Sequence, residues 1–128
     1  MTKVVGFGGI FFKAKDPAAL RAWYAKHLGL EFDPWGSISF RFEATSPAGR
    51  DVYAVFSPFK DDTEYFAPSS APFMFNFRVD DLDAILAELR RDGVEVLPDL
   101  ADEEGCGRFG WIIDIEGNKI ELWEPPVK

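Results

Sequence analysis

The feature that most constrains the fold is the repetition of one helix-bearing unit within the chain. Asp16 stands directly before a proline and predicts the start of a helix, and Gly29 predicts its end. Asp81 and Gly93 bound a second predicted helix. The two aspartates lie 65 residues apart and the two glycines 64, so the second helix repeats the first with a slip of one residue. Such a repeat predicts two copies of one structural module.

Apolar residues recur at helical spacing in both predicted helices, so each helix should present one face to a sheet. In the first helix these residues are Leu20, Trp23, Tyr24, His27 and Leu28. In the second they are Leu82, Ile85, Leu86 and Leu89. His27 is the only histidine, and its place on this stripe favours a structural role over a metal-binding or general-base role.

Segments with the composition of strands precede and follow each helix. They are residues 7–14, 30–32, 38–42 and 51–56 in the first half, and 73–79, 94–96, 109–113 and 119–123 in the second. Alternation of apolar and polar residues predicts half-buried strands, and turn-forming sequences at 46–49 and 114–117 predict two hairpins. Each module is therefore predicted to be βαβββ, and the fold class is α+β.

The length of the chain, 128 residues and 14.4 kDa, fits a single domain. The predicted parts are module one at about residues 5–58, a linker at about 59–72 and module two at about 73–126, all within the single domain 1–128. Prolines and a charge cluster indicate a linker, while its bulky Phe59, Tyr65 and Phe66 suggest a lid or edge cover.

Charge and composition exclude several classes of partner. The formal net charge of −8 argues against nucleic acid and against an anionic membrane surface, because both attract positively charged patches. No run approaches the roughly 20 apolar residues of a membrane helix. A small molecule is the expected partner.

The cysteine count and the N-terminus favour the cytoplasm. Cys106 is the only cysteine, which excludes an internal disulfide, and the first residues lack the pattern of a signal peptide. Cys106 lies in an acidic loop predicted at 101–107, where neighbouring carboxylates disfavour a nucleophilic thiolate.

An ordered set of short motifs spans nearly the whole chain. The motifs are the 13–17 entry into a helix that carries Trp23-Tyr24, the 28–30 exit, the 79–83 entry into the second helix, and 114–122 (Asp-x-x-Gly-Asn-x-Ile-Glu-Leu). This set resembles the vicinal oxygen chelate superfamily, which contains glyoxalases, bleomycin-resistance proteins and extradiol dioxygenases. The resemblance implies paired modules whose curled, mixed or antiparallel sheets enclose a cavity, often in a homodimer. Ile115 stands where the family usually has proline.

The resemblance also implies where metal ligands would lie, namely on the first and last strand of each module. When the two modules are aligned at the starts of their helices, Gly9 and Met74 take the ligand positions of the first strands. When they are aligned at the prolines that follow the last strands, Ala54 and Glu121 take the ligand positions there. One ligand of four is then suitable, whereas an open site normally needs about three protein ligands. We therefore expect no metal site and no cofactor.

The residues that share a strand face with these positions form the expected ligand-binding set. They are Phe11, Lys13, Arg41, Met74, Asn76, Arg78, Glu121 and Trp123. Glu121 is an acid in an otherwise apolar strand and requires a compensating partner. Three roles remain open for it: a buried partner of Arg41, Arg78 or Lys13, a ligand-binding group, or an acid–base or metal-binding group.

Two functions are compatible with the sequence. The favoured one is metal-independent binding of an apolar or aromatic small molecule in the cavity between the modules. The alternative is an enzyme, such as a glyoxalase-like lyase, an isomerase or a relative of the dioxygenases, in which Glu121 moves a proton or binds a metal.

Overall fold

The computed structural model describes residues 3–41 and 53–127. Within these ranges the elements in chain order are β1 (Val4–Ala14), α1 (Pro17–Leu28), β2 (Ile38–Arg41), β3 (Tyr53–Lys60), β4 (Phe73–Val79), α2 (Leu82–Arg91), β5 (Glu95–Glu103), β6 (Gly107–Ile113) and β7 (Lys119–Glu124). The strands form one mixed sheet in the order β2-β3-β1-β4-β7-β6-β5. This arrangement confirms the predicted α+β fold with an open sheet.

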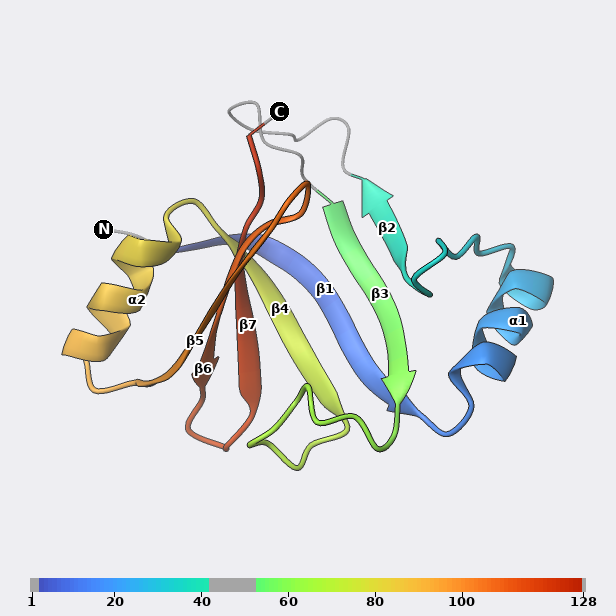
Figure 1. Cartoon of the computed structure of the whole chain (residues 1–128), viewed down its shortest axis with the longest axis horizontal. Coiled ribbons are helices and arrows are strands. Elements are labelled where there is room, and N and C mark those ends of the chain that lie inside the picture. Colours follow the sequence, from blue (N-terminus) through green and yellow to red (C-terminus); the bar gives the residue numbers. More distant parts are fainter. Residues whose placement is uncertain (1–2, 42–52, 128) are drawn as a thin grey trace.

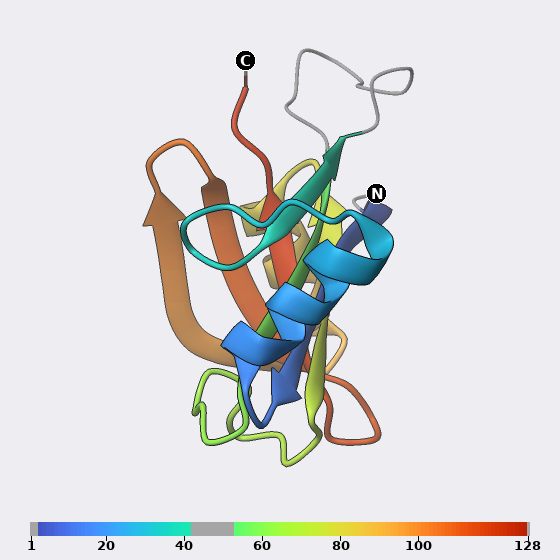
Figure 2. The same cartoon turned by 90° about the vertical axis from the view of Figure 1, so that its right-hand side faces the viewer.

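The two modules meet at the centre of the sheet, where β1 and β4 pair in antiparallel register. Each of these strands also pairs in parallel with the last strand of its own module, β1 with β3 and β4 with β7. The sheet curls strongly, and α1 and α2 lie at its opposite ends (Figure 1). Figure 2 shows α1 running along the outside of the first module. The concave face between the modules is therefore free of helices.

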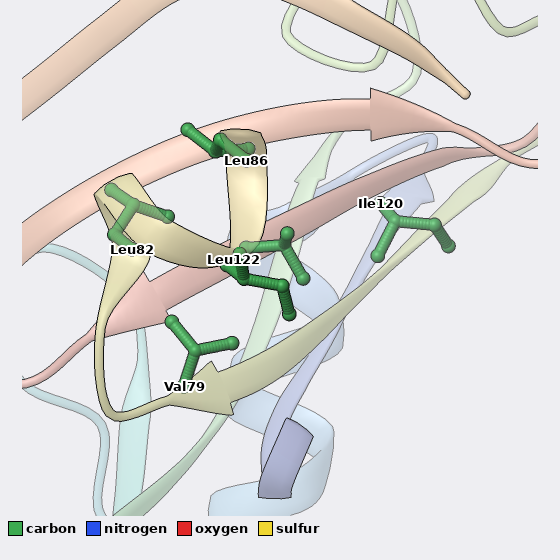
Figure 3. Packing of buried hydrophobic residues seen from close by; sticks show 6 residues of the cluster. Val79, Leu82, Leu86, Ile120 and Leu122 are labelled. Carbon is green, nitrogen blue, oxygen red and sulfur yellow. The ribbon is translucent and has the colours of Figure 1, made fainter. Parts of the chain in front are cut away.

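Helix α2 forms the core of the second module as predicted. The Asp81 side chain accepts a hydrogen bond from the Ala84 amide at 3.0 Å and begins the helix. Leu82 and Leu86 then join Leu122 and Ile120 of β7 in one buried cluster, in which Leu122 lies between them and Ile120 (Figure 3). Burying such a set of aliphatic side chains contributes roughly 1.5–3 kcal/mol per residue.

Helix α1 differs from the prediction in what its apolar stripe contacts. Asp16 caps its N-terminus through a 3.0 Å bond from the Ala19 amide, as the sequence indicates. Trp23, however, is 52% exposed, and His27 is exposed beside it with a ring separation of 5.0 Å. The helix does contact β1 and β3, and Tyr24 of the same stripe meets the ring of Phe56 on β3 edge-on. The helix lies along the outside of the module, so a stripe that faces the sheet was the wrong prediction for Trp23 and His27.

Three predicted boundaries are also wrong. Residues 30–32 form no strand, and they are followed by a turn in which the Asp33 side chain accepts hydrogen bonds from the amides of Trp35 and Ser37. Strand β3 continues to Lys60, into the predicted linker, because it pairs with β1 as far as Ala14. Strand β5 runs to Glu103, so the loop predicted at 101–107 is reduced to the short turn before Gly107. The turn predicted at 46–49 lies outside the described residues.

The hairpin of β6 and β7 has the predicted form. The Gly117 amide donates to the Asp114 carbonyl at 3.0 Å, and Gly117 has a positive φ of 83°. The Asp114 side chain accepts from the Glu116 and Asn118 amides. This turn fixes the register of the hairpin and sets Trp111 opposite Glu121.

Residues 61–72 connect the modules and pack inward rather than hanging free. Phe66 is fully buried against Met74 and Trp111. This segment, called loop 61–72 below, lies at the same end of the sheet as the turn between β6 and β7 (Figure 1). Its predicted role as a cover agrees with this burial.

Candidate functional site in the cavity between the modules

A cavity of about 460 Å³ lies on the concave face of the sheet, and both modules contribute to it. It is lined by Phe11, Ser37, Val55, Ser57, Phe59, Tyr65, Ala101, Glu103, Cys106, Phe109, Trp111 and Glu121. Five of these side chains are aromatic. The cavity is therefore mostly apolar and contains a small number of polar groups, as small-molecule sites usually do.

The Glu121 side chain is the most deeply buried charged group in the described part of the cavity wall, with 1% of the residue exposed. It lies beside Asn76 across the β4–β7 pair and beside Trp111 across the β6–β7 pair. Asn76 Nδ2 donates to Oε1 at 2.6 Å, while Trp111 Nε1 donates to Oε2 at 2.9 Å. Tyr65 reaches in from loop 61–72 and donates its hydroxyl to Oε2 at 2.5 Å. Three donors from three elements thus hold one carboxylate.

Burial and hydrogen bonding act in opposite directions on this carboxylate. Removal from water raises the pKa of Glu121, and the donors from Tyr65, Trp111 and Asn76 lower it. The net effect is that the pKa of Glu121 is raised above its ordinary value. Burial and the neighbouring Glu121 also raise the pKa of Tyr65, so its hydroxyl remains a donor.

The cation nearest to this group belongs to the same strand. Lys119 shares a strand face with Glu121, and its Nζ donates to the Tyr65 carbonyl at 2.6 Å. The ammonium lies 5.2 Å from the ring centre of Tyr65 and 5.3 Å from that of Trp111. Burial lowers the pKa of Lys119, while the charge of Glu121 opposes this effect.

The run Gly6-Phe7-Gly8-Gly9 makes room for the polar side chains of β4. A Cβ on Gly8 would lie 1.7 Å from Asn76 Oδ1, and one on Gly6 would lie 2.0 Å from a terminal nitrogen of Arg78. The side chains of Asn76 and Arg78 on β4 therefore lie across the backbone of β1. Asn76 Oδ1 is buried and has no hydrogen-bond partner among the described residues. The absence of a side chain at Gly8 thus leaves the space that Asn76 occupies, and Gly6 does the same for Arg78.

The structure brings part of the predicted binding set together. Phe11 and Glu121 line the cavity, and Asn76 hydrogen-bonds to Glu121. Trp123 is buried, donates to the Cys106 carbonyl at 2.6 Å, and stacks on Phe109 of the cavity wall.

The other predicted residues lie elsewhere. Met74 is buried in the cluster beneath loop 61–72. Lys13 lies 5.9 Å from the ring of Phe66, Arg41 lies 4.7 Å from the ring of Tyr53, and Arg78 Nε donates to the Phe7 carbonyl at 3.3 Å. None of the three cations that the sequence offered as partners for Glu121 is among the side chains that hydrogen-bond to it. Neutral donors take that place, because Lys13 and Arg41 lie at strand ends and the Arg78 side chain lies over Gly6.

The matching of Ala54 with Glu121 is also wrong. Val55 and Ser57 line the cavity, so Ala54 faces the other side of β3 by strand alternation. The register Gly9↔Val55 accounts for the difference, because it is set by pairing with β1 and not by the distance to the following proline.

Several residues of the site were missed by the sequence analysis. Trp111 could have been found by counting across the predicted hairpin, because the turn places it opposite Glu121. Ser57, which hydrogen-bonds to the Ser37 hydroxyl at 2.8 Å, could have been found from the β1–β3 register. Tyr65 was recognised only as one of the bulky residues of a cover, and its bond to Glu121 was missed because that contact depends on how loop 61–72 folds back.

The described residues around Glu121 offer few ligands for a metal ion. Among the described residues no group of three or more His, Cys, Asp or Glu side chains could hold one. Both oxygens of Glu121 already accept hydrogen bonds, and the groups that Trp111 and Asn76 direct at them are N–H donors, Nε1 and Nδ2, which do not bind a cation. The nearby Met74 sulfur is a poor ligand for a hard cation.

Paired modules that curl one sheet around a cavity define a protein of the glyoxalase and bleomycin-resistance type. The family described as the glyoxalase-like domain matches residues 9–123, and the chain therefore belongs to this family. This result confirms the superfamily that the sequence motifs resemble. No curated protein sequence matches the chain.

Solved structures share the fold at low sequence identity. Methylmalonyl-CoA epimerase from Mycobacterium tuberculosis has a TM-score of 0.62 and 21% identity, over 96% of this chain and 89% of that one. The Streptomyces coelicolor epimerase in complex with 2-nitronate-propionyl-CoA has a TM-score of 0.62 and 19% identity, over 94% and 96%. A glyoxalase/bleomycin resistance protein/dioxygenase superfamily member from Vibrio splendidus 12B01 has a TM-score of 0.55 and 11% identity, over 97% of this chain and 99% of that one. These similarities show the fold alone.

None of the described helices is long and apolar enough to cross a membrane.

Proposed function

We propose that this chain binds an apolar or aromatic small molecule in the cavity between the modules, without the help of a metal ion. The observation that carries the proposal is the composition of the cavity wall, where five aromatic side chains surround one hydrogen-bonded carboxylate. The volume of about 460 Å³ falls in the range of roughly 300–1,000 Å³ that is typical of small-ligand sites.

The polar groups of the wall support a binding role because they are preorganised. Glu121 is fixed by three donors, and Ser57 is fixed by its bond to Ser37. A ligand would meet groups that need not reorder, which reduces the entropic cost of binding. The donor set around Glu121 supports binding without a metal.

The proposal is tested by a thermal-shift screen of aromatic compounds followed by calorimetric titration. A ligand at 100 times its dissociation constant should stabilise the protein by about 2.7 kcal/mol. Phe109→Ala removes a ring from the cavity wall and should weaken each true hit by about tenfold or more, while Phe7→Ala on the other face of the sheet should leave the affinity unchanged.

Two results would overturn the proposal. The first is a set of hits that bind equally well to Phe109→Ala and Trp111→Ala. The second is a stoichiometric transition metal in the purified protein that is lost with Glu121→Gln and on which ligand binding depends.

A second candidate function is acid–base catalysis by Glu121, on a substrate with an acidic carbon next to a carbonyl. The upward direction of its pKa favours this function, because a more basic carboxylate is a better proton acceptor near neutral pH. Hydrogen–deuterium exchange at such a carbon in a keto acid or thioester, followed by NMR and lost with Glu121→Gln, would support catalysis. Absence of exchange in any ligand that binds would support binding alone.

A further inference from the structure

The charged side chains among the described residues that line the cavity are all acidic. Glu121 lies at the base of the cavity and Glu103 is exposed at its wall. The remaining lining residues are aromatic, aliphatic or small and polar. We propose that the ligand of this cavity is an organic cation, an alkylated ammonium or a flat aromatic cation, held between the aromatic rings and Glu121. This inference rests on the binding function proposed above.

The rings of the wall form a continuous surface. Phe59 and Tyr65 stack with centroids 5.6 Å apart, and Phe11 lies 5.4 Å from Phe59. Trp111 meets Tyr65 at a near-perpendicular angle with centroids 6.2 Å apart. Rings from several elements around one space resemble the aromatic cages that bind quaternary ammonium groups, because the face of each ring carries partial negative charge.

The hydrogen bonds to Glu121 strengthen this surface. Tyr65 and Trp111 both donate to the carboxylate, and donation to an anion shifts electron density into the ring of the donor. The two rings nearest to the carboxylate thus become better acceptors for a cation. An ionised carboxylate has about four lone-pair positions, and three are occupied, so one acceptor position remains.

The protein itself already places a cation against this aromatic wall. The Lys119 ammonium lies over the rings of Tyr65 and Trp111 and is held there by the Tyr65 carbonyl. Despite its low exposure, this amine takes a carbonyl, and no carboxylate of the described residues, as its hydrogen-bond partner. The two rings therefore contribute to holding a cation, and the ligand would use the cavity side of the same wall.

The net charge of −8 supports the same ligand class at longer range. An acidic protein attracts cations from solution and repels anions, and this effect raises the association rate of a cationic ligand at low ionic strength. An anionic ligand would have to approach both this field and the two carboxylates of the wall.

The inference is tested with pairs of cationic and neutral probes. Choline and its neutral carbon isostere 3,3-dimethylbutan-1-ol share a shape and differ in charge, and benzyltrimethylammonium and benzyl alcohol form a second pair that shares the aromatic ring. We expect each cation to bind about tenfold more tightly than its neutral partner, because a desolvated cation–π contact is worth about 1–2 kcal/mol. Calorimetric titration, supported by NMR shifts of the Trp111 indole N–H, gives the affinities.

Variants locate the effect in the cavity. Glu121→Gln should reduce the affinity for benzyltrimethylammonium by about tenfold or more and leave that for benzyl alcohol within about twofold. Glu116→Gln changes the net charge equally at an exposed turn residue and should have no effect on either. Phe109→Leu keeps the carboxylate but removes a ring, so it should weaken the cation specifically. Circular dichroism confirms that each variant is folded.

The possible outcomes separate this inference from the proposed function. If neutral aromatic compounds bind in a manner that depends on Phe109 while the cations bind no better than their isosteres, the cation inference is wrong and the binding function stands. If neither class of probe binds in the cavity, both fail. If the cations bind equally well to Glu121→Gln and Phe109→Leu, the cation site lies elsewhere and the inference is wrong.

Discussion

At the scale of single residues, the function depends on how Glu121 is compensated. A buried carboxylate without a partner is costly, and the sequence offered three cations for it. The structure supplies neutral donors instead, from Asn76, Trp111 and Tyr65. Neutral donors leave the negative charge of the carboxylate in place. That remaining charge is what makes Glu121 available to a ligand.

The raised pKa of Glu121 predicts how stability depends on pH. Its ordinary value is 4.5, and burial raises it in the folded state. Below the ordinary value both states are protonated and the group has no effect on stability. Above the ordinary value the unfolded state gives up this proton while the folded state keeps it, so the free energy of unfolding falls as the pH rises until the folded pKa is passed. Tyr65 and Lys119 also face this group: burial raises the pKa of Tyr65, so its hydroxyl stays protonated over the same range, and burial lowers the pKa of Lys119.

Glu121→Gln should therefore become more stable relative to the wild type as the pH rises from about 4.5 towards neutrality. The glutamine oxygen can accept from Trp111 and Tyr65, and its amide can donate to Asn76 once the Asn76 amide turns over. Urea unfolding of both proteins at several pH values measures the difference, with Glu116→Gln as the control. A variant that gains stability relative to the wild type as the pH falls would contradict the assigned direction.

The residues of the site differ in how well the sequence predicts them. Glu121 was predictable because a single acid interrupts an apolar strand, and Phe11 and Asn76 followed by alternation from the same reasoning. Trp111 required only the register of a hairpin whose turn was recognised. Tyr65 depends on packing between parts of the chain that are distant in sequence, which no local pattern encodes.

At the scale of elements, loop 61–72 links the core to the cavity. Phe66 is fully buried beneath the loop, and the adjacent Tyr65 reaches Glu121. Lys119 holds the backbone between them through the Tyr65 carbonyl. The loop thus places one aromatic wall of the cavity, and its position depends on the Phe66 anchor.

We expect Phe66→Ala to lower the free energy of unfolding by about 3–5 kcal/mol, because it leaves a cavity in a packed cluster. Tyr65→Phe retains the ring but removes one donor to Glu121, and it should cost about 1.5–3 kcal/mol. Trp35→Ala, at a residue that is 86% exposed, should change stability by no more than about 0.5 kcal/mol. Chemical unfolding gives all three values, and a Phe66→Ala protein as stable as Trp35→Ala would contradict the anchoring role.

Element prediction succeeded where the signal was local. Both helices begin at the aspartates that cap them, and the β6–β7 turn has the predicted hydrogen bonds. It failed where neighbours decide the result. Strand β3 extends past the predicted boundary because β1 offers it a partner. Trp23 is half exposed and packs on its helix neighbours Tyr24 and His27. Residues 30–32 pair with no described strand.

At the scale of the whole molecule, the face of the central strands opposite the cavity carries exposed apolar side chains. Phe7 is 46% exposed and contacts Phe77 of β4, and Val5 lies beside it on β1. The two helices lie at opposite ends of the sheet and leave the middle of this face without a cover from the described helices (Figure 1). A second copy of the chain could bury these residues. The homodimer expected from the family resemblance therefore remains a prediction, and this face is where we place its contact.

Sedimentation equilibrium tests this prediction, because a dimer has twice the 14.4 kDa mass of one chain. Phe7→Asp should shift the population to the monomer, since a charge at the centre of an apolar contact is left unpaired. Ile115→Asp introduces the same charge at a fully exposed turn residue and should leave the mass unchanged.

Because Phe7 faces away from the cavity, the monomeric variant should retain its affinity for a cavity ligand within about twofold. A wild type that is monomeric at every concentration would show the dimer prediction wrong, and ligand binding that is lost with the dimer would show that the partner completes the cavity.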